Sequence, residues 1–380
     1  MPAPLDGKRV VVLDGGVAGL YAAHVLARFG ATTIIVEPAA GHPVRRLSPF
    51  PNDRPQRESS GWWSFLARGQ RSIVLNLTAP TGKAILRRIP SDVALVPPEH
   101  VSLMTDRSVV VVTPHGIGGS SAGAPATDLT LAAAGGIMAS SGEADRPPLA
   151  PPGPAVHVAA GLFAAIAALY LFQSPDSEQA DLALVETVVA TGIYETTTFA
   201  YRGAVRQRSG PKYSPALVLN TTLRCADGYV GLHLNTQPQW RALCDFMERP
   251  DLVEDPRFRT SPRRAANWQE LDAIVLPWAA SRSAQYLYHE GQRRRVPFSL
   301  IPRPSEVLAS AQLNARAYFE AVDHPALGPL LLPGAPFRID GDRGRGDRGP
   351  QFGEDTAEVL AEAGVGAAEL PRLRAAGILY

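Results

Sequence analysis

The chain has 380 residues, of which 37 are lysine or arginine and 36 are aspartate or glutamate, and 45% of them are hydrophobic. This size and apolar content suffice for two or three domains with sizeable cores. The balanced charge argues against nucleic-acid and membrane-surface partners. The two cysteines, Cys225 and Cys244, form neither a disulfide framework nor a metal-ligand pattern. Without a signal peptide before Leu5, we expect a cytoplasmic protein that holds no metal.

The chain begins with a strand–helix–strand pattern. A β-branched run at 8–13 ends in a DGG turn at 14–16, and a helical pattern then leads to a second strand that ends at Glu37. Dinucleotide-binding domains open in this way, but their G-x-G-x-x-G fingerprint would need glycine at position 14. Asp14 places a carboxylate where two phosphates would lie. We therefore interpret this unit as an α/β scaffold and not as a dinucleotide site.

The next part of the chain alternates short strands with a helix. The Pro- and Arg-rich stretch 39–60 is expected to cross the surface without regular structure. A turn feeds a strand in SFLARGQRSIVLNL, a helix is predicted over 81–89, and further strands over 93–96 and 108–113. This alternation predicts a parallel sheet covered by helices.

The longest apolar run, residues 153–172, predicts a buried helix. Crossing a bilayer takes about 20 apolar residues, so we place this helix in a protein core. His157 then lies in its first turn, where unpaired backbone N–H groups favour a neutral imidazole over a cation. Such a histidine can serve as an acid or base, or it can merely cap or pack.

Several segments, in the same order along the chain, resemble the family III CoA-transferases (the CaiB/BaiF family). They include LDGKRVVVLD, VAGLYAAHVLARFGATTIIVEP, GHPVRR, ATDLTLAAAGGIM, DGYVGLHLNTQPQWRALCDFMERPDLVEDPRF and FGEDTAEVLAEAGVGAAELPRLRAAGIL. The resemblance implies a Rossmann-like large α/β domain, a smaller α+β domain and an interlocked homodimer. We draw the large domain at 1–201, the small domain at 202–337 and a returning segment at 338–380, which begins with the flexible charged linker DGDRGRGDRGP.

The chain departs from this family where the family carries its chemistry. Family members begin the long middle helix with D-x-x-x-G, and that aspartate is the nucleophile. Here the aligned residue is His157, with Gly161 four positions on. Racemase members carry a histidine before the aspartate that aligns with Asp128, and that position is Thr127. An imidazole is better suited to moving protons than to forming an anhydride, so the usual transferase and racemase arrangements are both missing.

The segments that contact CoA in the family are also shortened. The loop after the first strand is shorter, and the E-N-F-x-P-G segment expected after Asp92 is largely absent. We therefore expect no required cofactor and at most weak binding of a CoA thioester. The candidate phosphate contacts are Arg45 and Arg46, and also Arg68 and Arg71, which match the family's N-R-G-K-R.

Three functions stay open. The first is a repurposed enzyme that uses His157 for acid/base chemistry, such as isomerisation, dehydration or cyclisation, on an acyl or polyketide-like small molecule, as in natural-product biosynthesis. Asp128, His115 and Tyr194 lie on segments expected near the same cleft, although Asp128 can simply cap its helix and His115 can simply form a turn. The second is a non-catalytic subunit in a heterodimer with an intact family member. The third is ordinary CoA transfer by another nucleophile.

Overall fold

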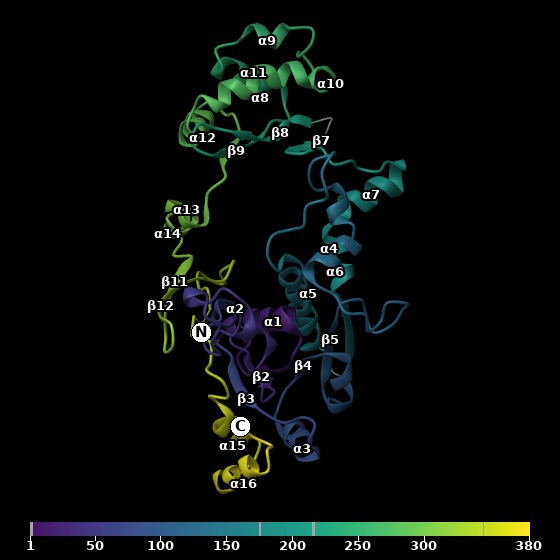
Figure 1. Cartoon of the computed structure of the whole chain (residues 1–380), viewed down its shortest axis with the longest axis vertical. Coiled ribbons are helices and arrows are strands. Elements are labelled where there is room, and N and C mark those ends of the chain that lie inside the picture. Colours follow the sequence, from purple (N-terminus) through teal and green to yellow (C-terminus); the bar gives the residue numbers. More distant parts are fainter. Residues whose placement is uncertain (1–2, 175, 215–216, 345) are drawn as a thin grey trace. The chain divides into compact units, whose positions relative to one another are not determined.

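The chain divides into two compact units, shown in the computed structural model of Figure 1, which describes residues 3–174, 176–214, 217–344 and 346–380. The first unit contains residues 1–136, 151–193 and 312–380, and the second contains residues 137–150 and 194–311. The small domain drawn from the sequence thus overlaps the second unit over 202–311, whereas 312–337 belong to the first unit.

A six-stranded parallel sheet organises the first unit. Its strand order is β3-β2-β1-β4-β5-β6, the order of doubly wound nucleotide-binding folds. The strands are β1 (Arg9–Leu13), β2 (Thr32–Glu37), β3 (Arg71–Val74), β4 (Val93–Val96), β5 (Ser108–Thr113) and β6 (Gln179–Ala183). Each neighbouring pair is parallel, which confirms the predicted sheet.

Helices cover both faces of this sheet because successive side chains of a buried strand point to opposite sides. Val12 lies toward α1 (Gly16–Arg28), which packs along α5 (Ala155–Leu171). The neighbours of Val12, Val11 and Leu13, belong instead to a core shared with α3 (Pro80–Arg88), α15 (Thr356–Glu362) and α16 (Leu370–Ala375). The end of the chain therefore completes a core begun by its first strand.

The other elements of the first unit are short. They are η1 (Pro43–Arg46), η2 (Pro51–Asp53), α2 (Gly61–Leu66), η3 (Pro98–Leu103), α4 (Asp128–Ala134), α6 (Leu184–Thr191), η5 (Ala367–Glu369) and the antiparallel hairpin of β11 (Phe319–His324) and β12 (Gly328–Pro333). The helix α14 (Ala311–Ala315) leads into this hairpin.

The helix α5 matches the predicted range, and the expected burial holds for one of its faces. One face, which includes Ala160, Gly161 and Ala164, is buried. The other face exposes apolar side chains, namely Leu162, Phe163, Ile166, Leu169 and Tyr170. No helix within the described residues is long and apolar enough to cross a bilayer.

The second unit is an α+β fold around an antiparallel sheet in the order β10-β9-β8-β7. Its strands are β7 (Lys212–Ser214), β8 (Leu217–Arg224), β9 (Tyr229–His233) and β10 (Phe298–Leu300). Its helices are η4 (Ile137–Ser140), α7 (Ile193–Arg202, from the unit boundary), α8 (Gln237–Phe246), α9 (Asp251–Glu254), α10 (Ser261–Ala266), α11 (Trp268–Ala280), α12 (Ala284–Arg293) and α13 (Pro304–Leu308).

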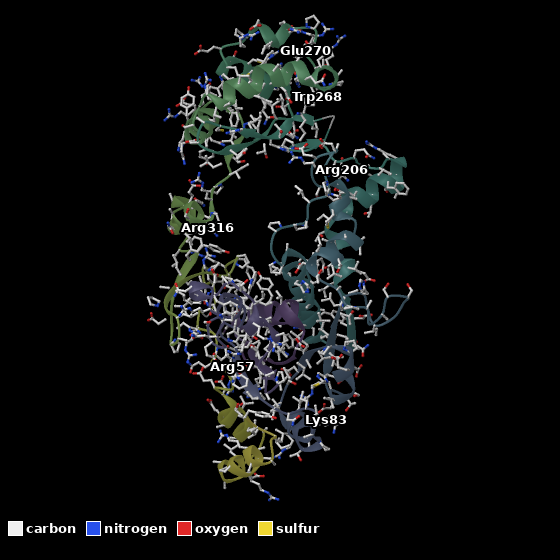
Figure 2. The ribbon with its side chains drawn as sticks, in the orientation of Figure 1. Arg57, Lys83, Arg206, Trp268, Glu270 and Arg316 are labelled. Atoms are coloured by element: carbon white, nitrogen blue, oxygen red, sulfur yellow. The ribbon has the colours of Figure 1, made fainter. Side chains whose placement is uncertain are left out.

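Two side chains of α11 that Figure 2 labels, Trp268 and Glu270, contact charged residues elsewhere in this unit. On α11, the ring of Trp268 lies 4.5 Å from Nζ of Lys212, and Glu270 pairs with Arg257. Both cysteines, Cys225 and Cys244, are free and buried.

The charged linker at 340–350 is anchored in part, contrary to the expectation of a flexible connection. Arg343 is buried and donates to the carbonyl oxygen of Ala335, while its own carbonyl oxygen accepts from Arg28 on α1. Residue 345 lies outside the described residues. These contacts hold the start of the returning segment against the first unit.

Candidate active site

Asp128 and His157 form a hydrogen-bonded pair in the first unit. Oδ2 of Asp128 lies 2.7 Å from Nδ1 of His157, and both side chains are partly exposed. A carboxylate only accepts hydrogen bonds, so the proton of this bond lies on Nδ1. In a neutral ring, Nε2 is then left as a proton acceptor.

Asp128 also caps the helix that carries His157. Its Oδ1 accepts from the backbone N–H groups of Val156, at 3.0 Å, and of His157, at 3.4 Å. These are two of the unpaired donors of the first turn of α5. Asp128 does not cap its own helix, because the side chain of Thr127 does so through a capping box with Thr130. The carboxylate therefore fixes both the backbone and the ring of His157.

The close approach of α5 to α1 explains why position 161, four residues after His157, is a glycine. A Cβ atom at Gly161 would lie 2.8 Å from the carbonyl oxygen of Ala18 on α1. At the other end of α5, Nζ of Lys8 donates to the carbonyl oxygen of Phe172 at 3.2 Å. The two helices therefore run in the same direction. This places the start of α5 at the carboxyl edge of the sheet, where parallel α/β folds bind ligands.

The other two candidate catalytic residues, His115 and Tyr194, lie on other segments of the chain. His115 lies half-buried in the turn that follows β5, which a hydrogen bond from the N–H of Ile117 to Asp181 holds at 3.1 Å. Tyr194 belongs to the second unit, where its ring lies 5.6 Å from the guanidinium carbon of Arg206. Of the four candidate catalytic residues, Asp128 and His157 are the two that the structure joins.

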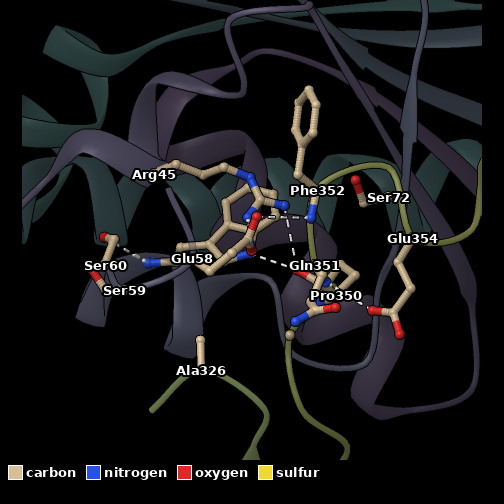
Figure 3. A network of polar contacts seen from close by, with 12 residues as sticks. Arg45, Glu58, Ser59, Ser60, Ser72, Ala326, Pro350, Gln351, Phe352 and Glu354 are labelled. Carbon is tan, nitrogen blue, oxygen red and sulfur yellow. Dashed lines mark hydrogen bonds and ion pairs between the residues drawn. The ribbon is translucent and has the colours of Figure 1, made fainter. Parts of the chain in front are cut away.

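Arg45, which the sequence suggests as a phosphate contact, is engaged in ion pairs within the fold. Its side chain is only 2% exposed and is bound by Glu37, at 2.7 Å, and by Glu58, at 2.8 Å. The guanidinium also stacks on Trp63 and donates to the carbonyl oxygen of Pro350 (Figure 3). A phosphate could reach it only by breaking these ion pairs.

Arg68 and Arg71, which are also expected to contact a phosphate, are engaged in ion pairs in a similar way. Arg68 is buried and donates to Glu320 at 2.7 Å. Arg71 begins β3, at the amino edge of the sheet, and its side chain pairs with Glu362 on α15 at 2.7 Å. Arg46 is exposed at the end of η1 and stays a candidate contact.

A cavity of about 460 Å³ lies at the carboxyl ends of β1, β2 and β3. Its polar lining comprises Asp14, Glu37, His42, Asn76, Thr78, His100 and Tyr380, and no lysine or arginine is among the described residues that line it. Sequence reasoning did not assign His42 to a site. Its position in the sequence could have identified it, because His42 follows the second strand of a parallel sheet and therefore lies at the edge where such sheets bind ligands.

The model of the family described as CoA-transferase family III matches residues 5–95 and 105–356. The chain belongs to this family. It is 27% identical, over 95% of its length and 94% of the relative, to the succinyl-CoA–D-citramalate CoA-transferase of Chloroflexus aurantiacus. It is also 27% identical, over 99% of its length and 98% of the relative, to subunit BbsE of the succinyl-CoA:(R)-benzylsuccinate CoA-transferase of Thauera aromatica.

A solved structure of a CaiB/BaiF family protein from Brucella suis shows the same fold. Its TM-score is 0.84 at 24% identity, and the match covers 96% of this chain and all of that chain. In the chain described here, residues 96–104 are left out of the family match. This stretch contains η3 (Pro98–Leu103). His100 on η3 lines the cavity.

Proposed function

We propose that this chain is an enzyme that moves protons with His157, on a small molecule of the acyl or polyketide-like kind. The observation that carries this proposal is the 2.7 Å contact between His157 and Asp128 at the start of α5. Because Asp128 binds the Nδ1 proton, Nε2 of His157 accepts a proton from the substrate, and the carboxylate stabilises the imidazolium that forms. Isomerisation, dehydration and cyclisation all need such a step. Membership of family III supports an acyl substrate.

A non-catalytic role in a heteromeric transferase is the second candidate, and the name of one relative favours it. BbsE is named as a subunit of a CoA-transferase. In such an assembly an intact family member would supply the nucleophilic aspartate that His157 replaces here. Conventional CoA transfer by another nucleophile is the third candidate, in keeping with the transferase names of the relatives.

Exchange of substrate hydrogen with solvent tests the proposal directly. The chain is incubated in D₂O with a panel of acyl thioesters of N-acetylcysteamine, which lack the nucleotide of CoA, and deuterium on the α-carbon is measured by mass spectrometry. His157→Ala should slow the exchange about 10²- to 10⁴-fold, the range of general acid/base catalysis. His289→Ala, at an exposed histidine of the second unit, is the matched control and should exchange at the normal rate.

The other outcomes separate the three candidates. Exchange that persists at full rate in His157→Ala would contradict the proposal. Transfer of CoA from succinyl-CoA to a carboxylic acid without α-carbon exchange would support conventional transfer. Activity that arises only after an intact family member is added would support the subunit role.

A further inference from the structure

The cavity at the carboxyl ends of β1, β2 and β3 lies where parallel β-α-β folds bind phosphates at a helix N-terminus. In this chain the side chain of Asp14 occupies that position. The side chain of Asp14 accepts a hydrogen bond through Oδ1 from the N–H of Gly16, the first residue of α1, at 3.2 Å. A phosphate placed there would meet the charge of this carboxylate, which is 54% exposed.

The second carboxylate in the lining, Glu37, is already neutralised. It is fully buried, accepts from Nε and Nη2 of Arg45 at 2.7 and 2.8 Å, and also accepts from the hydroxyl of Ser72. The backbone N–H of His42 is a further donor to it, at 2.8 Å. Among the side chains of the described lining residues, Asp14 therefore provides the carboxylate whose charge is left for a ligand.

His42 adds no compensating positive charge to the cavity. Its Nδ1 accepts from the N–H of Val44 at 3.2 Å, so the ring proton lies on Nε2. Nε2 lies 3.4 Å from the carbonyl oxygen of Asp14 and 3.6 Å from its Oδ1. Burial lowers the pKa of His42, although Asp14 and Glu37 oppose this shift. A neutral His42 thus holds Asp14 in place without neutralising it.

We propose that this cavity binds an organic amine, whose ammonium group pairs with Asp14 and whose hydrocarbon part lies against Leu13, Val36, Leu75 and Leu77. Unpaired carboxylate charge at the mouth of an apolar cavity favours a cation and disfavours a phosphate or a carboxylate. The proposal concerns a site distinct from the proton transfer at His157 and holds whether or not that transfer occurs.

Three probes that share one ring system and differ in charge test the proposal by isothermal titration at pH 7.5. They are tryptamine, a cation, indole-3-propionamide, which is neutral, and indole-3-propionate, an anion. Tryptamine should bind at least about tenfold more tightly than the amide, since a hydrogen bond to a charged group contributes that much. Indole-3-propionate should bind most weakly, and raising the ionic strength should weaken tryptamine binding.

Asp14→Asn removes the charge, retains a side-chain oxygen and tolerates the left-handed backbone of this position, whose φ is 62°. This variant should lose the preference for tryptamine while its thermal unfolding stays unchanged. Asp53→Asn is the matched control, because Asp53 is exposed, has a φ of 54° and lies outside the cavity. The proposal is overturned if tryptamine does not bind, if the anion binds as tightly, or if Asp14→Asn keeps the preference.

Discussion

Glu320 on β11 shows how a single residue neutralises buried charge. Its two carboxylate oxygens bind Arg28 at 2.6 Å and Arg68 at 2.7 Å, and both arginine side chains are almost fully buried. Burial alone would raise the pKa of Glu320, but the hydrogen bonds from Arg28 and Arg68 leave this pKa below its ordinary value of 4.5. One carboxylate on β11 thus balances two cations of the N-terminal part.

Glu320→Gln should lower the free energy of unfolding by about 3 kcal/mol, because two buried guanidinium groups lose their charged partner. Since the pKa of Glu320 is lower in the folded state, its contribution is present above about pH 4.5 and is lost as the pH falls further. Urea titrations should therefore show a constant difference from the unmodified chain near neutral pH and a shrinking one in acid.

The control for this comparison is Glu358→Gln. Glu358 also pairs with an arginine, Arg71, but it is 76% exposed, so the change should stay within about 0.5 kcal/mol. Equal losses in the two variants would show that burial of the ion pair does not decide its strength.

Both members of the His157–Asp128 pair could be predicted from the sequence, because each residue aligns with a functional position of the family III CoA-transferases. It could not predict that Asp128 caps α5, since that bond depends on how α4 and α5 pack. The ion pairs of the arginines could not be predicted for a related reason. The partner of Arg68, Glu320, lies far away in the sequence, so nothing local marks Arg68 as part of a buried ion pair.

Among the elements, the contact between α1 and α5 is set by Gly161. Gly161→Ala would ordinarily stabilise a helix by about 1 kcal/mol. Here the added Cβ meets the backbone oxygen of Ala18, which cannot move without shifting α1, so a net loss of about 1 to 3 kcal/mol is expected. Chemical unfolding measures whether the free energy of unfolding falls or rises. A stabilised Gly161→Ala protein would contradict the close approach of the two helices.

Elements with a strong periodic pattern could be predicted from the sequence, and short ones could not. The β-branched runs of β1, β4 and β5 and the long apolar stretch of α5 lie where they were expected. The short helix α2 is not predicted, and its last three residues fall in a predicted turn, because about one and a half turns carry too little periodicity. The exposure of one side of α5 could not be predicted either, since both sides are apolar.

For the whole molecule, the exposed apolar face of α5 supports the homodimer that the family resemblance implies, and we propose that a second copy covers it. Light scattering should report a dimer down to nanomolar concentration, because an interlocked dimer buries far more than the roughly 1,600 Å² of a standard interface. Ile166→Glu, which places a charge in this face at a residue that is 61% exposed in the single chain, should reduce the dimer fraction. A monomer for the unmodified chain would contradict the proposal.

Binding of CoA is the second prediction for the whole molecule. The stretch after β4 forms η3, and Asp14 fills the start of α1, so the expected CoA contacts are reduced. Isothermal titration with CoA and acetyl-CoA should give dissociation constants above about 1 mM, equivalent to about 4 kcal/mol of binding free energy. The citramalate CoA-transferase of Chloroflexus aurantiacus, titrated alongside, serves as the comparison. Micromolar affinity for this chain would favour conventional transfer.

The core that joins β1 to α15 and α16 has a consequence for the order of folding during synthesis. Val11 and Ile34 leave the ribosome early, but the residues that cover them, such as Leu360 and Leu379, are made last. Residues 194–311 can meanwhile assemble most of the second unit. The helix α3 is made early and covers part of this face, so the nascent sheet waits with the rest of the face uncovered for most of translation, a state in which chains aggregate and chaperones bind.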